Sequence, residues 1–432
     1  MSARMRKEEI NRLLLRQRGL AVMRSSLDAP SARGMLGILY LVSDERPEEG
    51  KVAELLARLW EELAVETEPL LPDAWQSRMV SEILDSENPF SLCAEKDEVP
   101  PVLMEQARRD LRSLKLLFDL DSVTLFEMVE RAVPSLGGMW VPWRDPGRCN
   151  DGSPRCAIAS ILASTDDWGE CAEPLVEHFR RHGAGRFGRF RAFRWDKGAL
   201  KPVAHPDPVS LRNLIGYERE RTPIVANTRR FLKGLPAHHA LLYGLPGTGK
   251  SSTVKAVSNE MAEDGLRLIE VAKEDLGELP MVLDAVRERG LRFVVFVDDL
   301  SFEENEVEYK SLKALLEGSV ESPPENVRIY ATSNRRNLIR ESFSERGGGD
   351  DIHSHDTMHE KQSLAARFGL RVTFPTPDQE KYLEIVRGLV KERGIEASEE
   401  ELVEKALLWD RWQPGRSGRT ARQFVDELQA GG

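Results

Sequence analysis

Apolar residues recur every three or four positions through the first 179 residues, which is the spacing that gives an α-helix one apolar face. The stretches from Val52 to Leu63 and from Leu103 to Phe118 are the clearest, and prolines and glycines interrupt the pattern between them. The pattern predicts a mainly helical N-terminal domain over residues 1–179. This part of the chain carries no internal repeat and no motif that predicts a chemistry.

The pattern changes after residue 210, where short apolar runs alternate with stretches of helical spacing. Continuous apolar runs of about five residues are typical of parallel strands covered on both faces, so we expect an α/β domain over residues 211–376. From Tyr382 on, the spacing is helical alone, which predicts a small helical domain over residues 377–432. The expected strands are 240–243, 266–271, 293–297 and 327–331, and the expected helices between them are 250–261, 279–288 and 306–317.

Residues 180–210 lie between these regions and differ from both. They are basic and aromatic and then rich in proline, which breaks regular structure, so we expect a linker with a domain boundary near Lys201. Eight basic residues and one acidic residue give the stretch 180–201 a charge of +7. Basic side chains interleaved with aromatic ones predict weak binding to single-stranded nucleic acid. The alternative is that the aromatic side chains pack on the next domain while the arginines are solvated or form ion pairs.

The composition of the whole chain limits its partners. The 432 residues carry a net charge of −11, so the chain as a whole is not expected to attract nucleic acid or anionic lipid. The apolar stretch Met35–Val42 is far shorter than the about 20 residues that cross a bilayer, and residues 1–8 lack a signal-peptide core. We therefore expect a cytoplasmic protein without membrane insertion. The four cysteines lack the paired spacing of zinc sites and are expected to be reduced thiols: Cys93, Cys149, Cys156 and Cys171.

The most informative motif is the octet GLPGTGKS at residues 244–251, which follows an expected strand and precedes an expected helix. This is a complete G-x4-G-K-[ST] phosphate-binding loop in the strand–loop–helix setting that its mechanism requires. Its glycines let backbone N–H groups turn toward the phosphates, Lys250 reaches the β- and γ-phosphates, and Ser251 supplies a hydroxyl to Mg²⁺. The expected nucleotide-binding residues are Gly244, Pro246, Gly247, Thr248, Gly249, Lys250, Ser251 and Ser252.

A second signal is the pair of carboxylates that ends the apolar run 293–297. A strand with acids at its carboxyl end is what a magnesium ion and an attacking water need beside a phosphate-binding loop. We expect Asp298 to hold the metal through water, together with Ser251, and Asp299 to orient or deprotonate the nucleophilic water. The alternative is that the two acids cap the following turn.

These motifs occur in the order found in AAA+ ATPases, and residues 211–428 resemble that family. The sequence ATSN at 331–334 resembles the strand end that carries the sensor 1 residue, which makes Asn334 a contact of the γ-phosphate or the water. The sequence ARFG at 366–369 resembles the arginine-finger box of branch-migration motors and replication initiators, so Arg367 is the expected finger.

The end of the chain extends the resemblance. The sequence SGRTAR at 417–422 resembles sensor 2, for which Arg419 is favoured over Arg422. Within AAA+, three stretches look most like a bacterial family of predicted AAA+ ATPases of unknown function: residues 214–218, 298–302 and 416–424.

The resemblance implies an AAA+ P-loop αβα domain with a parallel sheet, a C-terminal helical lid, ATP and Mg²⁺ as ligands, and assembly into a homo-oligomeric ring such as a hexamer. In such a ring Arg367 would serve the neighbouring subunit's nucleotide. The implied function is ATP hydrolysis that remodels or switches a client, which the sequence does not name. The guanine-reading motif Asn-Lys-x-Asp is absent from the sequence, which favours ATP over GTP.

Two features leave alternatives open. Many AAA+ proteins have Glu where this chain has Asp299, so a nucleotide-gated binding or scaffold module with negligible turnover is the alternative, unless Glu303 or Glu304 assists hydrolysis. A P-loop kinase is disfavoured by Asn334 and the lid. A zinc site could form from residues that stand beside a run of glycines, although the glycines favour a polar loop: Asp351, His353, His355, Asp356, His359 and Glu360.

Overall fold

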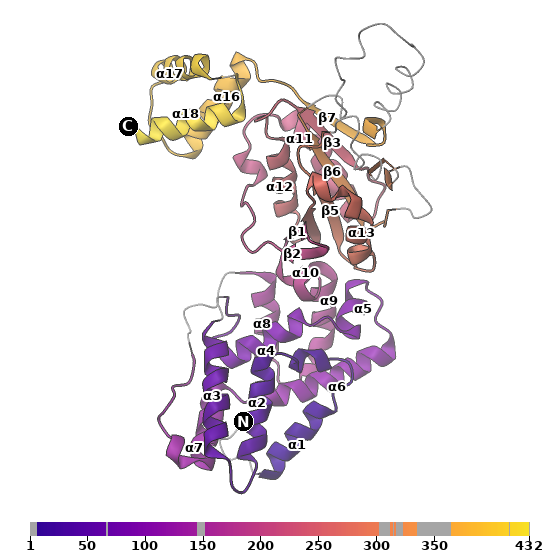
Figure 1. Ribbon diagram of the computed structural model, residues 1–432, viewed down its shortest axis with the longest axis vertical. Coiled ribbons are helices and arrows are strands. Elements are labelled where there is room, and N and C mark those ends of the chain that lie inside the picture. The colour runs from indigo at the N-terminus through magenta and orange to yellow at the C-terminus, as the bar shows by residue number, and fades with distance from the viewer. Residues whose placement is uncertain are drawn as a thin grey trace. The chain divides into compact units, whose positions relative to one another are not determined.

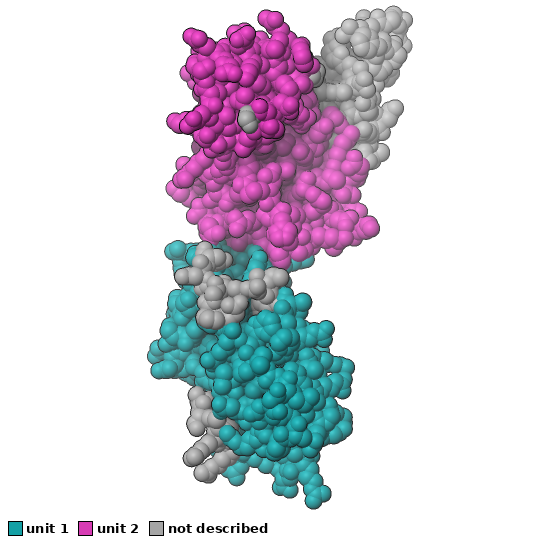
Figure 2. Space-filling model, turned by 90° about the vertical axis from the view of Figure 1, so that its left-hand side faces the viewer, with its two compact units in different colours: residues 1–189 teal, residues 190–432 magenta. Residues whose placement is uncertain are grey.

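The computed structural model describes residues 7–65, 68–144, 152–301, 312–313, 315–316, 323–334, 364–413 and 415–431. Several expectations lie outside these residues: Cys149, Glu303, Glu304, the histidine-rich stretch at 351–360 and most of the expected helix 306–317. The chain divides into two compact units, residues 1–189 and 190–432, which Figure 2 shows in different colours.

The first unit is built from helices (Figure 1), as the apolar spacing predicts. In α3 the side chains of Val52, Leu56, Leu59 and Leu63 are buried at helical spacing. The α-helices are α1 (Lys7–Arg18), α2 (Pro30–Val42), α3 (Glu49–Ala64), α4 (Ala74–Asp85), α5 (Pro89–Glu95), α6 (Pro101–Phe118), α7 (Ser122–Ala132), α8 (Pro154–Ser164), α9 (Ala172–His182) and α10 (Gly185–Arg189). Short 3-10 helices join them at η1 (Arg24–Leu27), η2 (Pro134–Leu136) and η3 (Trp168–Cys171).

A buried acid helps to fix the fold of this unit. The carboxylate of Asp110 on α6 accepts hydrogen bonds from the backbone N–H groups of Ala21, Val22 and Met23 at 3.0, 2.7 and 3.0 Å. A buried carboxylate is stable only when such donors satisfy it. Asp110 therefore ties the connection after α1 to the middle of α6.

The second unit is a seven-stranded sheet with the order β2-β1-β4-β5-β6-β3-β7. All neighbouring strands are parallel except β1 and β2. The strands are β1 (Ala192–Asp196), β2 (Ala199–Pro202), β3 (Ala240–Gly244), β4 (Leu266–Glu270), β5 (Arg292–Val297), β6 (Val327–Ser333) and β7 (Leu370–Phe374). Strands β3 to β6 fall where the apolar runs predict them, to within two residues at each end.

Helices cover both faces of this sheet (Figure 1). Helices α11 (Glu218–Leu232) and α12 (Lys250–Glu260) lie on one face, and α13 (Leu279–Arg287) lies on the other. Alternate strand residues such as Leu242, Val294 and Phe296 share a core with α11 and α12. Three helices near the end of the chain form the expected lid: α16 (Gln379–Glu392), α17 (Glu399–Trp412) and α18 (Gly418–Ala430). The predicted α/β fold with a C-terminal helical lid is thereby confirmed.

The expected linker 180–210 differs from the structure, because it contains strands β1 and β2 of the sheet. The aromatic side chains of Phe187, Phe193 and Trp195 are buried. Among the basic residues, Arg180 pairs with Glu177, Arg189 with Asp85 and Arg194 with Glu270. Buried aromatic rings and ion-paired arginines are what the packing alternative expects, and binding of nucleic acid by this stretch stays a prediction.

No helix in the described part of the chain combines the length and the apolar character needed to cross a bilayer.

The packing of β1 yields a stability prediction. Phe193 is 1% exposed, so Phe193→Ala should lower the free energy of unfolding by about 3–5 kcal/mol. Arg194→Ala, on the same strand, removes a side chain that is 64% exposed and pairs with Glu270, and should cost less than about 1 kcal/mol. Chemical denaturation followed by tryptophan fluorescence compares the two variants. Equal losses would show that β1 is not part of the core.

Candidate functional site

The carboxyl ends of three neighbouring parallel strands meet at one edge of the sheet. Strand β6 lies between β3 and β5, with Ser333 opposite Tyr243 and Ala331 opposite Val297. The residues that follow these strands therefore leave the sheet side by side. They are the glycine-rich loop after β3, the acids after β5 and Asn334 after β6.

The glycine-rich loop needs glycine at specific positions. A Cβ on Gly244 would stand 2.2 Å from the carbonyl oxygen of Phe374 on the neighbouring strand β7. Gly247 and Gly249 have φ angles of +80° and +88°, in the left-handed region that other residues rarely adopt. Gly249 is the N-cap of α12, so the loop delivers the positive end of that helix to the edge of the sheet.

Lys250 lies in the first turn of α12 and is only 5% exposed. Its Nζ donates hydrogen bonds to the carbonyl oxygens of Gly244 and Leu245 at 2.8 and 2.9 Å, and to Oδ1 of Asn334 at 3.0 Å. Burial lowers the pKa of Lys250, while the nearby carboxylates of Asp298 and Asp299 act in the opposite direction. The expected phosphate-binding cation thus contacts both the loop and the expected sensor residue.

The two acids after β5 are held by neighbours from helix α12 and from the end of β6. Ser251 Oγ donates to Asp298 Oδ1 at 2.6 Å, and Asn334 Nδ2 donates to Asp299 Oδ1 at 2.6 Å. Both acids lie at the surface of the described chain. The hydroxyl of Ser251 and the carboxylate of Asp298 are hard oxygen donors of the kind that Mg²⁺ prefers, and this ion usually takes its other ligands from water and phosphate. The residues present therefore fit a magnesium ion.

The described residues contain no group of three or more His, Cys, Asp or Glu side chains arranged to hold a metal ion. The histidine-rich stretch at 351–360 lies outside those residues, so the structure does not bear on the zinc alternative.

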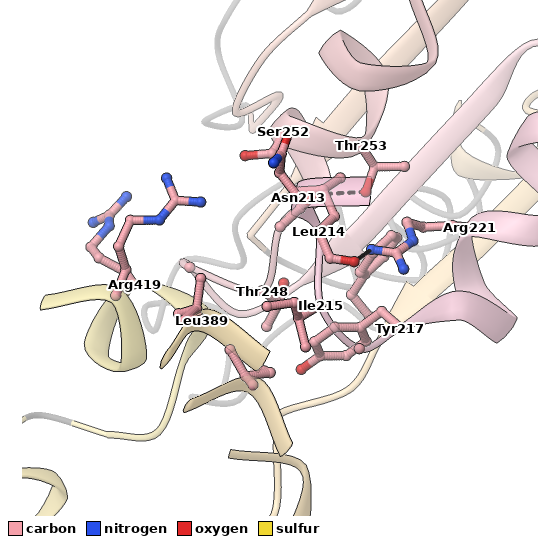
Figure 3. A pocket seen from close by; sticks show the side chains of 17 residues that line it. Asn213, Leu214, Ile215, Tyr217, Arg221, Thr248, Ser252, Thr253, Leu389 and Arg419 are labelled. Atoms are coloured by element: carbon pink, nitrogen blue, oxygen red, sulfur yellow. Dashed lines mark hydrogen bonds between the residues drawn. The ribbon is translucent and has the colours of Figure 1, made fainter. Parts of the chain in front are cut away.

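A pocket of about 220 Å³ adjoins the glycine-rich loop. Its walls come from the glycine-rich loop with the start of α12, from the segment Asn213–Tyr217 before α11, and from lid helices α16 and α18. Figure 3 shows Thr248 and Ile215 from the α/β domain facing Leu389 and Arg419 from the lid. Ser252 and Thr253 of α12 line the same pocket.

The lid contacts the glycine-rich loop directly. The backbone N–H of Gly418, the first residue of α18, donates to the carbonyl oxygen of Gly247 at 2.8 Å. A Cβ on Gly247 would stand 2.9 Å from Oγ of Ser417, so only glycine fits under the end of the helix. The amino ends of α12 and α18 thus both meet this loop.

The three arginines singled out by the sequence lie in different places. Arg419 and Arg422 both line the pocket, so the geometry does not choose between them as sensor 2. Arg367 is exposed and precedes β7 by three residues, at the amino edge of the parallel sheet. This is the edge opposite the glycine-rich loop, and Arg367 is not among the residues that line the pocket.

Sequence reasoning assigned no role to the segment before α11, although residues 214–218 contributed to the family resemblance. Tyr217 has a left-handed φ of +61°, and its hydroxyl donates to the carbonyl oxygen of Pro375 at 2.7 Å. Burial raises the pKa of Tyr217 to about 12. Arg221 is 8% exposed and donates to the carbonyl oxygen of Leu214. These contacts hold the segment against the pocket. The one sequence signal for it is a glycine followed by tyrosine at the start of a helix, which is compatible with an unusual turn.

Comparison with known proteins places the chain in a family. Residues 188–431 match the family described as "Protein of unknown function (DUF815)". The chain belongs to this family. The DUF815 match, with the P-loop and the order of the sheet, confirms its recognition as an AAA+ ATPase of a family of unknown function. At a coarse level this is the fold of nucleoside triphosphate hydrolases.

Individual relatives of this DUF815 member are distant. Replication factor C subunit 5 of Homo sapiens is 28% identical over 109 residues, which cover 23% of this chain and 29% of that protein. The RuvB Holliday junction branch migration motor of Thermotoga maritima is 19% identical, with 52% of this chain and 65% of that chain covered and a TM-score of 0.36. A point mutant of the same motor gives 18% identity, coverages of 52% and 66%, and a TM-score of 0.37.

The contact between the lid and the loop can be tested without nucleotide. Gly247→Ala and Gly249→Ala both put a side chain on left-handed backbone, which costs about 1–2 kcal/mol. Only the Gly247 variant also brings a Cβ against Ser417, since nothing lies within 4 Å of a Cβ on Gly249. Hydrogen exchange of α18 should therefore rise in Gly247→Ala and much less in Gly249→Ala. The same exchange in both variants would contradict direct seating of α18 on the loop.

Proposed function

We propose that this protein binds ATP with Mg²⁺ between the glycine-rich loop and the lid, and hydrolyses it. The observation that carries the proposal is the convergence of Lys250 and Ser251 on Asn334 and Asp298, from strand ends that are distant in sequence. A buried cation, a metal-binding oxygen pair and a polar amide at one edge of the sheet are the groups that phosphoryl transfer to water requires.

Each residue has a distinct task in this proposal. Backbone N–H groups of Gly247 to Ser251 bind the phosphates at the positive end of α12, and Lys250 Nζ contacts the β- and γ-phosphates. Ser251 and Asp298 would hold Mg²⁺. The metal, when bound, neutralises negative charge on the phosphate oxygens. Asp299 orients the attacking water and accepts its proton, and Asn334 fixes the Asp299 carboxylate through the hydrogen bond from Nδ2.

The pocket suits the base and ribose of the nucleotide. Ile215, Ile385 and Leu389 supply apolar surface on both sides of it, as a purine ring requires. Arg419 and Arg422 approach from α18, where a guanidinium can reach the phosphates. Because the lid and the loop share the pocket, a bound nucleotide would hold the two parts of the second unit together.

The position of Arg367 is the argument for assembly into a homo-oligomeric ring. Strand β7 advances about 3.3 Å per residue, so its five residues separate the amino edge from the glycine-rich loop by about 13 Å. An arginine at the amino edge cannot reach the phosphates of its own chain over that distance, since a side chain extends about half as far. We propose that it completes the site of a neighbouring copy, in the cytoplasm, and that the assembly uses ATP to remodel or switch a client.

A nucleotide-gated switch with negligible turnover is the second candidate. The hydrogen bond from Gly418 to Gly247 favours it, because that contact gives the lid a direct way to respond to a bound phosphate. Release of phosphate by the purified protein separates the candidates: turnover that disappears in a phosphate-site variant supports the enzyme, and tight binding without turnover supports the switch.

Two substitutions should separate binding from hydrolysis. Lys250→Ala removes the cation placed against the phosphates, so ATP binding measured by calorimetry should become undetectable. Asp299→Asn keeps the hydrogen-bonding shape but loses the base, so it should bind ATP as the parent protein does and release phosphate at least about 100-fold more slowly. Unchanged ATP affinity in Lys250→Ala would mean that the phosphate site is elsewhere.

Mixing experiments test the placement of Arg367. Arg367→Ala should bind ATP normally yet lose most of its hydrolysis, because an arginine supplied by a neighbour can be worth about 10³ to 10⁵ in rate. In a mixture of the two inactive variants, some interfaces join the intact Asp299 of an Arg367→Ala subunit to the intact Arg367 of an Asp299→Asn subunit. Such a mixture should recover part of the activity. No recovery, in mixtures shown by sizing to assemble together, would mean that Arg367 does not act on a neighbour.

A further inference from the structure

Thr332 connects the two acids of the candidate site and was assigned no role from the sequence. It lies near the carboxyl end of β6, the strand between β3 and β5, and is 2% exposed. Its hydroxyl Oγ1 contacts Oδ1 of Asp298, and the backbone N–H of Asp299 donates to the same hydroxyl oxygen at 2.9 Å. Its carbonyl oxygen accepts from the N–H of Leu300 at 2.7 Å. One residue of β6 thus bonds to three consecutive residues after β5.

The direction of these hydrogen bonds follows from their chemistry. A backbone N–H can only donate, so the Thr332 oxygen is the acceptor toward Asp299. A threonine hydroxyl has one proton, and the nearby carboxylate of Asp298 accepts it. The proton of Thr332 therefore points at the acid expected to hold Mg²⁺, while its lone pair fixes the backbone of the acid expected to activate water.

The backbone of Asp299 needs this support. Its φ is +52°, in the left-handed region that is unfavourable for a residue with a Cβ. The N–H of Asp299 has a second acceptor in Asp298 Oδ1, at the longer distance of 3.2 Å. The left-handed turn presents the Asp299 carboxylate to Asn334, which donates to it at 2.6 Å. Loss of the Thr332 hydroxyl would leave the N–H of Asp299 with only the longer of these two bonds.

We propose that Thr332 is a positioning residue that sets the Asp298 carboxylate for the metal and the Asp299 carboxylate for water at the same time. This inference rests on the proposed function, since it concerns the acids of the same site. It assigns the coupling between metal binding and water activation to a single buried hydroxyl.

The test compares three substitutions of one side chain. Thr332→Val keeps the shape and removes the hydroxyl, Thr332→Ala removes the hydroxyl without any risk of a clash, and Thr332→Ser keeps the hydroxyl. Thr228→Val is the matched control, because it removes a buried hydroxyl that bonds to the carbonyl oxygen of Ile224 and the hydroxyl of Tyr330, neither of which belongs to the acids.

Binding of ATP is titrated at rising Mg²⁺ concentrations, and phosphate release is measured at saturating ATP. In the Val and Ala variants the Mg²⁺ concentration for half-maximal ATP binding should rise about 10- to 100-fold, the range expected for a lost hydrogen bond to a charged group. ATP affinity without Mg²⁺ should stay within about threefold, and turnover should fall by a similar 10- to 100-fold. The Ser variant should recover both properties, and Thr228→Val should change only the melting temperature.

The outcomes separate this inference from the proposed function. Parental Mg²⁺ requirement in both the Val and the Ala variant overturns the positioning role, as does a Ser variant as defective as Val. If the parent protein binds Mg²⁺ and ATP but does not hydrolyse ATP, the proposed hydrolysis is wrong. The role of Thr332 can still be tested in that case, because the Mg²⁺ titration does not depend on turnover.

Discussion

The parallel pairing of β6 with β3 on one side and β5 on the other is the constraint on which the candidate site depends. Adjacent strands lie about 4.8 Å apart, so residues that leave them at one edge come within hydrogen-bond reach. Lys250 meets Asn334, and Ser251 meets Asp298, only because the three strands end together. A slip of one residue in either pairing would turn these side chains to the other face of the sheet.

The glycine-rich loop serves both sides of the site. Its conformation brings the amino end of α12 to the edge of the sheet, and its carbonyl oxygen at Gly247 receives the amino end of α18. Two helix ends with positive dipoles thus approach one loop, which favours an anion between them. The lid and the α/β domain are tied together at the point where phosphate would bind, so changes at the phosphates have a direct mechanical route to the lid.

The parts of the fold with strong local signals could be predicted from the sequence. The apolar runs of β3 to β6 and the strand–loop–helix setting of residues 244–251 are local patterns, and the acids at 298 and 299 follow a buried strand. The strands β1 and β2 were missed because their alternation is carried by arginine and aromatic side chains, which also suit an exposed basic segment. Their burial depends on β4, which comes some 70 residues later and is not visible in the local pattern.

The site residues that the sequence did not reveal were missed for the same reason, which is that their roles depend on contacts outside the local sequence. Thr332, Tyr217 and Arg221 act through contacts with residues far along the chain or with backbone atoms, and such contacts have no sequence spacing of their own. The roles of Asn334, Arg367 and Arg419 came from family resemblance. The structure brings Asn334 to Lys250 and Asp299, places Arg419 beside the pocket, and leaves Arg367 at the opposite edge of the sheet.

In the proposed function a purine nucleotide binds with its base in the pocket between residues 213–217 and α16. Photolabelling with 8-azido-ATP and Mg²⁺, followed by mass spectrometry of the peptides, tests it most directly because the reactive group is on the base. Labelled peptides are expected within residues 211–221 and 379–392, and excess ATP should prevent the labelling. Labelling that ATP prevents but that falls only within residues 1–189 would contradict it.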